Sequence, residues 1–290
     1  MNIKITLLLI LALFSVSTSP IIAKALEGVT AISISFWRMF FASIVLWLYS
    51  YFRPQGKITI DKNRNKIIYA GILLGIHFAL FFTAIKTTNI SNATFLGTLA
   101  PFFTLLIELY ILKRNYSPII LVGLIFTFIG SIIILGYDFD LSTMHTMGNI
   151  YAILCSICLA IAFMIAEKVR SNETTIVYTR LLYLSASITL LIISIISSDN
   201  INDLINHTLL EYLGLLFLGL VPTILGHNSI YYAIKYVSPT IVGAFPLGEP
   251  IIATILAYFI FNEGIALNVV LGGSVTLSGL ILISQYKKNK

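Results

Sequence analysis

The sequence predicts an all-α integral membrane protein, with ten transmembrane helices arranged as two inverted five-helix repeats. Its composition supports the membrane assignment, because the chain is 58% hydrophobic and only 10% charged. A soluble domain is roughly 45–50% apolar and about 25% charged, so this chain has too few charged residues to cover a water-facing surface. Long apolar segments separated by short connections support the helical assignment, and a duplication within the chain supports the repeat.

Ten segments reach the length of about 20 mostly apolar residues that a spanning helix needs. In chain order they are 5–23, 31–52, 67–85, 92–112, 117–136, 148–166, 175–197, 209–234, 239–261 and 265–286. The first one also resembles a secretory signal peptide, with one lysine, an apolar core and the ending Ala23-Lys24-Ala25. We interpret it as a retained first helix, because the second half of the chain has a corresponding segment.

Three of the five segments in the first half follow the apolar pattern except at one or two positions. The second contains Arg38, the third contains His77, and the fourth contains Pro101 and Glu108. Ionisable groups inside spans are costly and are candidates for function. Glu108 lies about one turn from Lys113, so we expect it to extend toward the membrane interface in a structural role. The fifth segment is apolar with spaced glycines.

In the second half, the sixth segment contains Cys155 and Cys158 in a CxxC spacing. No second pair and no nearby histidine completes a metal or redox site, so we interpret them as small thiols that pack in a helix. The seventh segment has Arg180 near its start, where we expect a structural role. The eighth and ninth segments carry the densest polar features of the chain, and the tenth is rich in glycine.

The basic residues orient these segments, since short cytoplasmic loops carry an excess of lysine and arginine. With both termini in the cytoplasm, 14 of the 18 basic residues face that side, 2 face the other, and Arg38 and Arg180 lie within spans. We therefore expect a multi-pass protein of the inner (cytoplasmic) membrane. The formal net charge of +6 is explained by these loops rather than by a nucleic-acid partner.

An internal repeat divides the chain. The stretch "AIKTTNISNATFLGTLAPFF" from Ala84 matches "AIKYVSPTIVGAFPLGEPII" from Ala233 at an offset of 149, with 10 identities in 51 positions, among them Pro101 and Pro250. Each half, 1–140 and 141–290, then has five spans, and an odd number inserts the second half in the opposite direction. Inverted repeats are typical of secondary transporters, although duplication for folding economy alone gives the same pattern.

The chain resembles the drug/metabolite transporter superfamily, of the ten-helix EamA type. The resemblance rests on "AKALEGVTAISISFWRMFF", "LAPFFTLLIELYILKR" and "GAFPLGEPIIATILAYFIFNEGIALNVVLGGSVTLSGLILI", and it covers both halves. It implies a helical secondary carrier of metabolites, often amino acids and often exported. In the family a glutamate is frequent at the same place in both halves. The second half of this chain has Asn262-Glu263 there, but the first half departs from the pattern with Lys113-Arg114.

The eighth segment contains "GHNSIYYAIK", the strongest candidate for a binding surface. His227 and Tyr231 are four residues apart, as are Asn228 and Tyr232, so each pair shares one helix face. The equivalent positions of the first half are mostly apolar. We expect a cavity with one aromatic wall and one polar wall, which suits an amphipathic solute. An interfacial tyrosine belt is the alternative for the tyrosines.

The ninth segment places Glu249 beside Pro250, three residues after Pro246. Each proline removes a backbone donor, so we expect a helix bend here and at Pro101, and bent helices in membranes pack on protein or line a cavity. Glu249 either titrates during transport or is a static partner of His227 or Arg38. Arg38 either binds a substrate carboxylate or holds Glu249 or a backbone carbonyl in place. His77 is the remaining candidate for substrate binding.

These features predict a secondary transporter that exports small metabolites such as amino acids by alternating access. A channel or a non-transporting scaffold or receptor is the alternative. An enzyme is not expected, because HExxH, GxSxG and paired-aspartate motifs are absent from the sequence. We expect no cofactor and no metal, and the expected partners are a small-molecule substrate and membrane lipid.

Overall fold

The computed structural model describes residues 1–88, 90–135, 146–197, 201–261 and 264–285. Within these residues, ten helical spans are long and apolar enough to cross a membrane. Seven of these described spans are single α-helices: α1 (Ile3–Ala25), α2 (Ala31–Phe52), α3 (Asp61–Thr87), α6 (Pro118–Leu135), α7 (Thr146–Arg170), α8 (Thr175–Ile196) and α14 (Leu267–Ser284).

The other three spans are interrupted. The fourth consists of α4 (Ile90–Gly97), α5 (Ala100–Leu106) and the π-helical η1 (Ile107–Ile111). The eighth follows the short α9 (Ile201–Ile205) and consists of α10 (Leu209–Leu218), the π-helical η4 (Gly219–His227) and α11 (Asn228–Ala233). The ninth consists of α12 (Pro239–Ala244), the 3₁₀-helical η5 (Phe245–Gly248) and α13 (Glu249–Phe261).

The all-α membrane fold and its ten spans are confirmed. The expected boundaries differ most at the third span, where α3 begins at Asp61 because the polar stretch "DKNRNK" continues the helix beyond the apolar segment. The expected division of the chain at residues 140 and 141 lies outside the described residues and stays a prediction, and Asn262 and Glu263 also lie outside them.

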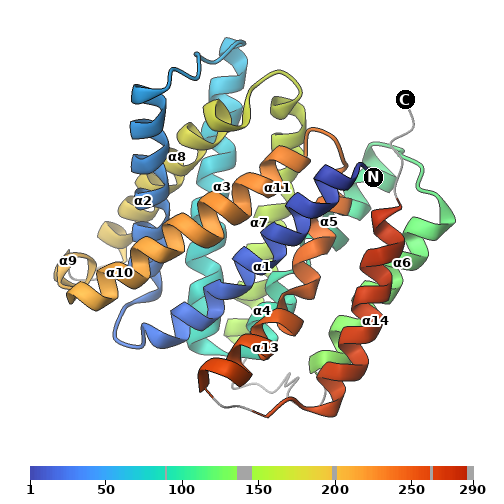
Figure 1. Cartoon of the computed structure of the whole chain (residues 1–290). Helices are drawn as coiled ribbons and strands as arrows, with labels where there is room; N and C mark the ends of the chain where they lie inside the picture. The colour runs from blue at the N-terminus through green and yellow to red at the C-terminus, as the bar shows by residue number, and fades with distance from the viewer. Residues whose placement is uncertain (89, 136–145, 198–200, 262–263, 286–290) are drawn as a thin grey trace.

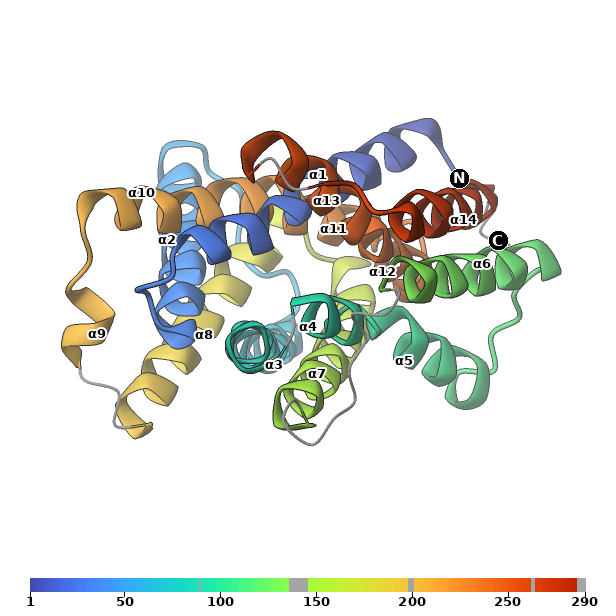
Figure 2. The same ribbon diagram turned by 90° about the horizontal axis from the view of Figure 1, so that it is seen from below.

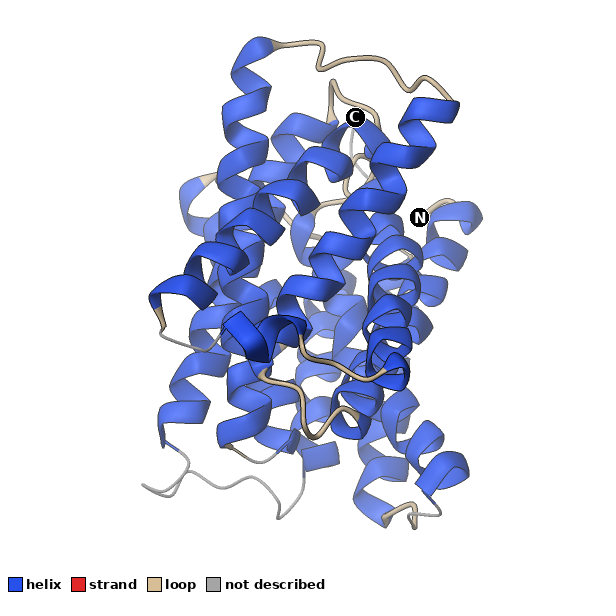
Figure 3. Cartoon of the chain, turned by 90° about the vertical axis from the view of Figure 1, so that its left-hand side faces the viewer, coloured by secondary structure: helices blue, strands red, loops and turns tan. Residues whose placement is uncertain are grey.

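The helices run between two ends of the molecule (Figures 1 and 3). The start of α1 and the end of α14 meet at one of them, where the Met1 ammonium donates a hydrogen bond to the Ser284 carbonyl at 3.0 Å. This end also carries the connections 53–60, 112–117, 171–174 and 234–238, and we call it the terminal end. The observed path of the chain therefore places alternate connections at opposite ends.

The packing follows the repeat. The first span, α1, packs on η4 and α11 of the eighth span, and α7, which opens the second half, packs on α3, the third span. Two further pairs consist of equivalent helices of the two halves, α2 with α8 and α6 with α14. The last pair lies at one edge of the molecule and α2 with α8 toward the other (Figures 1 and 2).

Glycines allow the close contact between α6 and α14. A Cβ atom at Gly130 would collide with the backbone and hydroxyl of Thr276. A Cβ at Gly279 would collide with the same groups of Thr127. These two contacts are related by the offset of the repeat, which equates Gly130 with Gly279 and Thr127 with Thr276. Small residues of this kind let helix backbones approach closely inside a membrane.

The outward faces of the bundle are apolar. Large exposed side chains on them include Phe14, Ile125, Ile132, Ile195 and Ile281. A soluble monomer rarely exposes so continuous an apolar surface, whereas a spanning protein meets lipid with it. The polar side chains are directed instead into the bundle, where the candidate site lies.

Candidate functional site

A small cavity lies inside the bundle, between α1, α2, α3, η4 and α13. Its volume is about 60 Å³, which is room for a few water molecules. Ser19, Arg38, His77, His227 and Glu249 supply most of its polar lining. We call it the central cavity. It brings together residues that are more than 200 positions apart in the chain.

Arg38 is buried and fixed by hydroxyl groups rather than by an acid. Its Nε donates to Thr223 Oγ1 at 2.8 Å, and its Nη1 donates to Ser19 Oγ at 2.7 Å. The guanidinium carbon lies 4.3 Å from the ring centroid of Phe78. These contacts hold the planar group in place but use only part of its N–H groups, so it retains donors for a carboxylate.

The π-helical turn η4 explains how Thr223 reaches Arg38. Pro222 has no N–H, so the Leu218 carbonyl loses its partner in the α-helical pattern. The Thr223 hydroxyl donates to this carbonyl at 2.9 Å, and the same oxygen accepts from Arg38. Turns of this type often occur at functional sites.

Two histidines face the cavity from the third and eighth spans. His77 Nδ1 lies 2.9 Å from the Cys155 carbonyl. Because a carbonyl only accepts, we assign the proton to Nδ1, and the neutral ring then has Nε2 as an acceptor. His227 Nδ1 is buried and has no hydrogen-bond partner among the described residues. Its ring lies 5.4 Å from that of Phe78. An unpaired buried nitrogen is available to a bound solute.

Glu249 opens α13, directly after the 3₁₀ turn η5. The backbone N–H of Glu249 donates to the Pro246 carbonyl. In a regular α-helix the N–H of residue 250 would donate to this carbonyl, but Pro250 has no N–H. The carboxylate lines the cavity, and within the described part of the chain it has no ion pair or hydrogen bond. A helix break is present at Pro246, where η5 is a 3₁₀ turn, and the fourth span is interrupted just before Pro101, between α4 and α5.

The central cavity unites four of the predicted residues, Arg38, His77, His227 and Glu249. No hydrogen bond or ion-pair contact joins Glu249 to Arg38 among the described residues, but the two opposite charges attract each other across the cavity. The expected aromatic wall is also present, formed by residues of α3.

The other three predicted residues lie elsewhere. Asn228 and Tyr232 line a second, more open cavity of about 570 Å³ at the terminal end, which we call the vestibule. Tyr231 lines neither cavity; it is fully buried against Tyr178 and Phe163, and its hydroxyl has no partner among the described residues. Helix periodicity placed these residues on shared faces, but the packing of α1 and α8 against α11 separates them.

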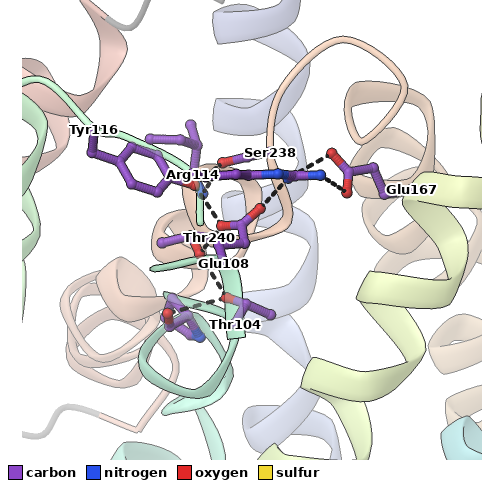
Figure 4. A network of polar contacts seen from close by, with 9 residues as sticks. Thr104, Glu108, Arg114, Tyr116, Glu167, Ser238 and Thr240 are labelled. Carbon is purple, nitrogen blue, oxygen red and sulfur yellow. Dashed lines mark hydrogen bonds and ion pairs between the residues drawn. The ribbon is translucent and has the colours of Figure 1, made fainter. Parts of the chain in front are cut away.

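A polar network connects the fourth, sixth and ninth spans (Figure 4). Glu108 of η1 is fully buried and accepts from Arg114, Tyr116 and Thr240. Arg114 also binds Glu167 of α7 with two hydrogen bonds, of 2.9 and 2.8 Å. The expectation that Glu108 extends toward the interface is therefore wrong, because Arg114 and two hydroxyl groups compensate its charge inside the protein.

The network extends to the start of α12. The Tyr116 hydroxyl lies 2.7 Å from that of Ser238, the N-cap of α12, and the Thr240 hydroxyl lies 3.0 Å from that of Thr104. The hydrogen bonds to Glu167, together with its charge and that of Glu108, raise the pKa of Arg114. Arg114 therefore stays cationic and keeps both carboxylates paired at neutral pH.

A second set of hydrogen bonds links the connection 53–60 to Glu173, in the turn after α7. Glu173 accepts hydrogen bonds from the backbone of Thr59 at 3.0 Å, from Ile60 at 3.2 Å and from the Asn63 amide at 2.9 Å. Burial raises the pKa of this carboxyl, but the hydrogen bonds outweigh burial and hold it below its usual value. Glu173 is thus a second anionic anchor at the terminal end.

Sequence reasoning missed Ser19, Thr223, Glu167 and Tyr116. Hydroxyl residues are common in apolar helices, and nothing in the pattern marks those that reach Arg38. Glu167 follows the sixth apolar segment and resembles an ordinary interfacial charge. Within the described residues, no group of three or more His, Cys, Asp or Glu side chains is placed to hold a metal ion.

The sequence matches a family model over both halves. The model of the EamA-like transporter family matches residues 2–136 and 146–285. An S-adenosylmethionine uptake transporter of Rickettsia bellii is 29% identical over 265 residues, covering 88% of this chain and 84% of that protein. An uncharacterized transporter of Bacillus subtilis, YyaM, is 23% identical over 262 residues, covering 86% of this chain and 85% of that protein.

A solved structure shares the fold. A crystal structure superposes with a TM-score of 0.81 at 15% sequence identity, covering 97% of this chain and 96% of the other. At this identity the similarity concerns the arrangement of helices alone.

Proposed function

The chain belongs to the EamA-like transporter family, a family of multi-pass membrane transporters rather than enzymes, and we propose that it is a secondary carrier of small amino-acid-like metabolites. The observation that supports this proposal most is the composition of the central cavity. It contains a cationic guanidinium, a carboxylate and two imidazoles within an otherwise apolar lining.

The charges of the cavity complement a zwitterion. The donors that Arg38 retains suit a substrate carboxylate, and Glu249, which has no hydrogen bond or ion-pair contact among the described residues, suits an ammonium or sulfonium group. Phe78 and Phe81 add an apolar surface for the rest of the solute. A relative is named for S-adenosylmethionine, which carries all of these groups, so this compound is the first to test.

Transport requires the bundle to rearrange. Ligand pockets are typically about 300–1,000 Å³, several times the 60 Å³ of the central cavity. A metabolite therefore enters only when helices separate at one end. The broken fourth, eighth and ninth spans border the cavity and are the elements that bend, and the network around Glu108 holds the terminal end closed. This arrangement suits alternating access between two inverted halves.

The proposal also concerns the membrane in which the protein lies and the direction of transport. The distribution of basic residues favours an inner (cytoplasmic) membrane with both termini in the cytoplasm. The resemblance to the wider family implies export, whereas one relative is named an uptake transporter. Flux measured in both directions decides between them.

The test is counterflow in proteoliposomes. Purified protein is reconstituted with unlabelled S-adenosylmethionine inside, and uptake of the labelled compound is followed and compared with a panel of amino acids. A carrier gives transient accumulation of label that saturates with concentration, and Arg38→Met abolishes it. A channel gives flux without counterflow, and a scaffold or receptor gives neither; both outcomes reject the proposal.

A further inference from the structure

The vestibule is strongly basic. Three cationic side chains line it: Lys4 from the start of α1, Arg170 from the end of α7, and Lys235 from the turn after α11. No carboxylate is among its described lining residues. A cavity lined by charges of one sign focuses its field and concentrates ions of the opposite sign.

Arg170 is buried and makes no ion-pair contact among the described residues. The side chain is only 2% exposed, and its Nε donates to the Tyr231 carbonyl at 3.0 Å. Its other hydrogen bonds go to the Glu173 carbonyl and to Thr175 Oγ1. The carboxylate of Glu173 accepts hydrogen bonds from Thr59, Ile60 and Asn63 and makes no ion-pair contact with Arg170 among the described residues, although its charge attracts the guanidinium from a distance. Buried charges normally have an ion-pair partner.

Two tyrosines complete the wall beside the lysines. The rings of Tyr232 and Tyr236 lie 5.3 Å apart, and the Lys4 ammonium lies 5.5 Å from the centroid of Tyr232. At the deep end, Asn228 lines the vestibule, and the preceding residue, His227, lines the central cavity. Cations, hydroxyl groups and an amide are thus collected around a space of about 570 Å³.

We propose that the vestibule is a second binding site, distinct from the central cavity, that takes a phosphate or carboxylate group. The group belongs either to a soluble metabolite or to a lipid headgroup, because both present the same anionic oxygens. Three cations that converge on one cavity, the buried Arg170 among them, and the lack of a carboxylate in its described lining carry this proposal. It does not depend on which solute the central cavity transports.

A general excess of basic residues at the terminal end does not account for this cluster. Lys62 and Lys66 are exposed on α3 at the same end and do not line the vestibule. They carry the same charge as Lys4 and Lys235, so their replacement is a matched control. Arg170 itself is left unchanged, because it also anchors the backbone of α11.

The test uses the full chain in detergent with inorganic pyrophosphate as the soluble probe. Thermal stabilisation is titrated at constant ionic strength for the wild type, for Lys4→Gln/Lys235→Gln and for the control Lys62→Gln/Lys66→Gln. We expect the wild type and the control to be stabilised alike. The vestibule variant should bind about tenfold more weakly, as the loss of two partly exposed charge contacts implies.

A second arm identifies the source of the anion. The same three proteins are purified with phosphatidylglycerol, and retained lipid is counted by native mass spectrometry. Response to pyrophosphate with unchanged lipid retention indicates a soluble ligand, and selective loss of lipid from the vestibule variant indicates a headgroup. If neither probe binds the wild type, or if both double variants lose binding equally, the proposal is overturned.

Discussion

At the scale of single residues, neighbours decide what each ionisable group does inside the bundle. Arg38 and Glu108 both looked like isolated charges in apolar segments, but they have opposite environments. Hydroxyl groups fix Arg38 beside the cavity and leave its charge available, whereas Arg114 pairs Glu108 directly. Glu249 resembles Arg38 in lining the cavity without an ion-pair contact among the described residues, although the two charges attract each other.

Glu249→Gln tests this difference. The amide keeps the shape and hydrogen-bonding capacity but removes the charge that we assign to a substrate cation. We expect the apparent affinity to fall about tenfold, the cost of about one charged hydrogen bond, with the shape of the pH profile unchanged. Concentration dependence of counterflow across a range of pH measures both.

The conservative variant Glu249→Asp serves as the control and should retain most of the affinity. If Glu249→Gln instead uncouples flux from a pH gradient while substrate exchange continues, the carboxylate moves a proton and is not a static contact. If Glu249→Gln has the flux, affinity and pH response of the wild type, the carboxylate is not part of the mechanism.

At the scale of helices, the three interrupted spans border the central cavity and the terminal-end network. Pro222 makes the π-helical turn that directs Thr223 to Arg38, and Pro246 makes the 3₁₀ turn before Glu249. The fourth span ends in a second π-helical turn, which carries Glu108 into contact with the start of α12. Each break therefore places one polar side chain at the cavity or in the network and also provides a point where the helix bends.

Arg114→Ala should open the terminal end. It leaves Glu108 and Glu167 as unpaired carboxylates near each other, so the contact between the fourth, sixth and ninth spans weakens. The reporter is Ala100→Cys, at a buried position that lines the central cavity, in a Cys155→Ser/Cys158→Ser background. We expect maleimide labelling to rise about fivefold or more, as a shift of about 1 kcal/mol implies.

Arg64→Ala is the matched control, because this exposed residue of α3 carries the same charge at the same end of the molecule. With Arg64→Ala added, the Ala100→Cys reporter should be labelled to the same extent as it is without this substitution. Unchanged labelling in Arg114→Ala would show that the network does not hold the end closed.

At the scale of the whole molecule, the repeat determines which helices meet. Contacts between α6 and α14 come in pairs related by the duplication, as Gly130 with Thr276 and Gly279 with Thr127 show. The same relation places α1 on the eighth span and α7 on the third. Two halves inserted in opposite directions thus surround one cavity, to which both contribute residues.

Gly130→Ala and Gly279→Ala should destabilise the protein to a similar extent. Each added methyl group would collide with the backbone of the facing helix, and overpacking of this kind costs about 1–3 kcal/mol. Gly273→Ala on the same helix as Gly279 is the control, because its nearest neighbour is an Ile251 side-chain atom at an ordinary 3.4 Å. Melting temperatures in detergent are compared; a loss in only one of the two variants would contradict equivalent packing.

Reporter fusions test the orientation of the chain. A reporter fused after Lys290 and one inserted at Asp61 should both be cytoplasmic, because the basic loops lie on that side. A reporter near Asp138 should be external. Alkaline phosphatase and green fluorescent protein activities in whole cells measure the two locations, and an external C-terminus would reject the assigned orientation.

The sequence by itself determined the membrane class, the ten spans, the repeat and four residues of the central cavity. These follow from composition, from apolar segment length and from the cost of a charge inside an apolar helix, all of which are local properties. Periodicity could also place Asn228 and Tyr231 on helix faces.

Only the tertiary structure decided what those faces meet. Tyr231 is packed against Tyr178, Asn228 lines the vestibule, and Ser19 and Thr223 reach Arg38 from two other spans. The pairing of Glu108 with Arg114 and Glu167 likewise joins residues from different elements. The physical reason is that a hydrogen bond or an ion pair depends on distances between atoms, and helix packing, not sequence spacing, sets those distances.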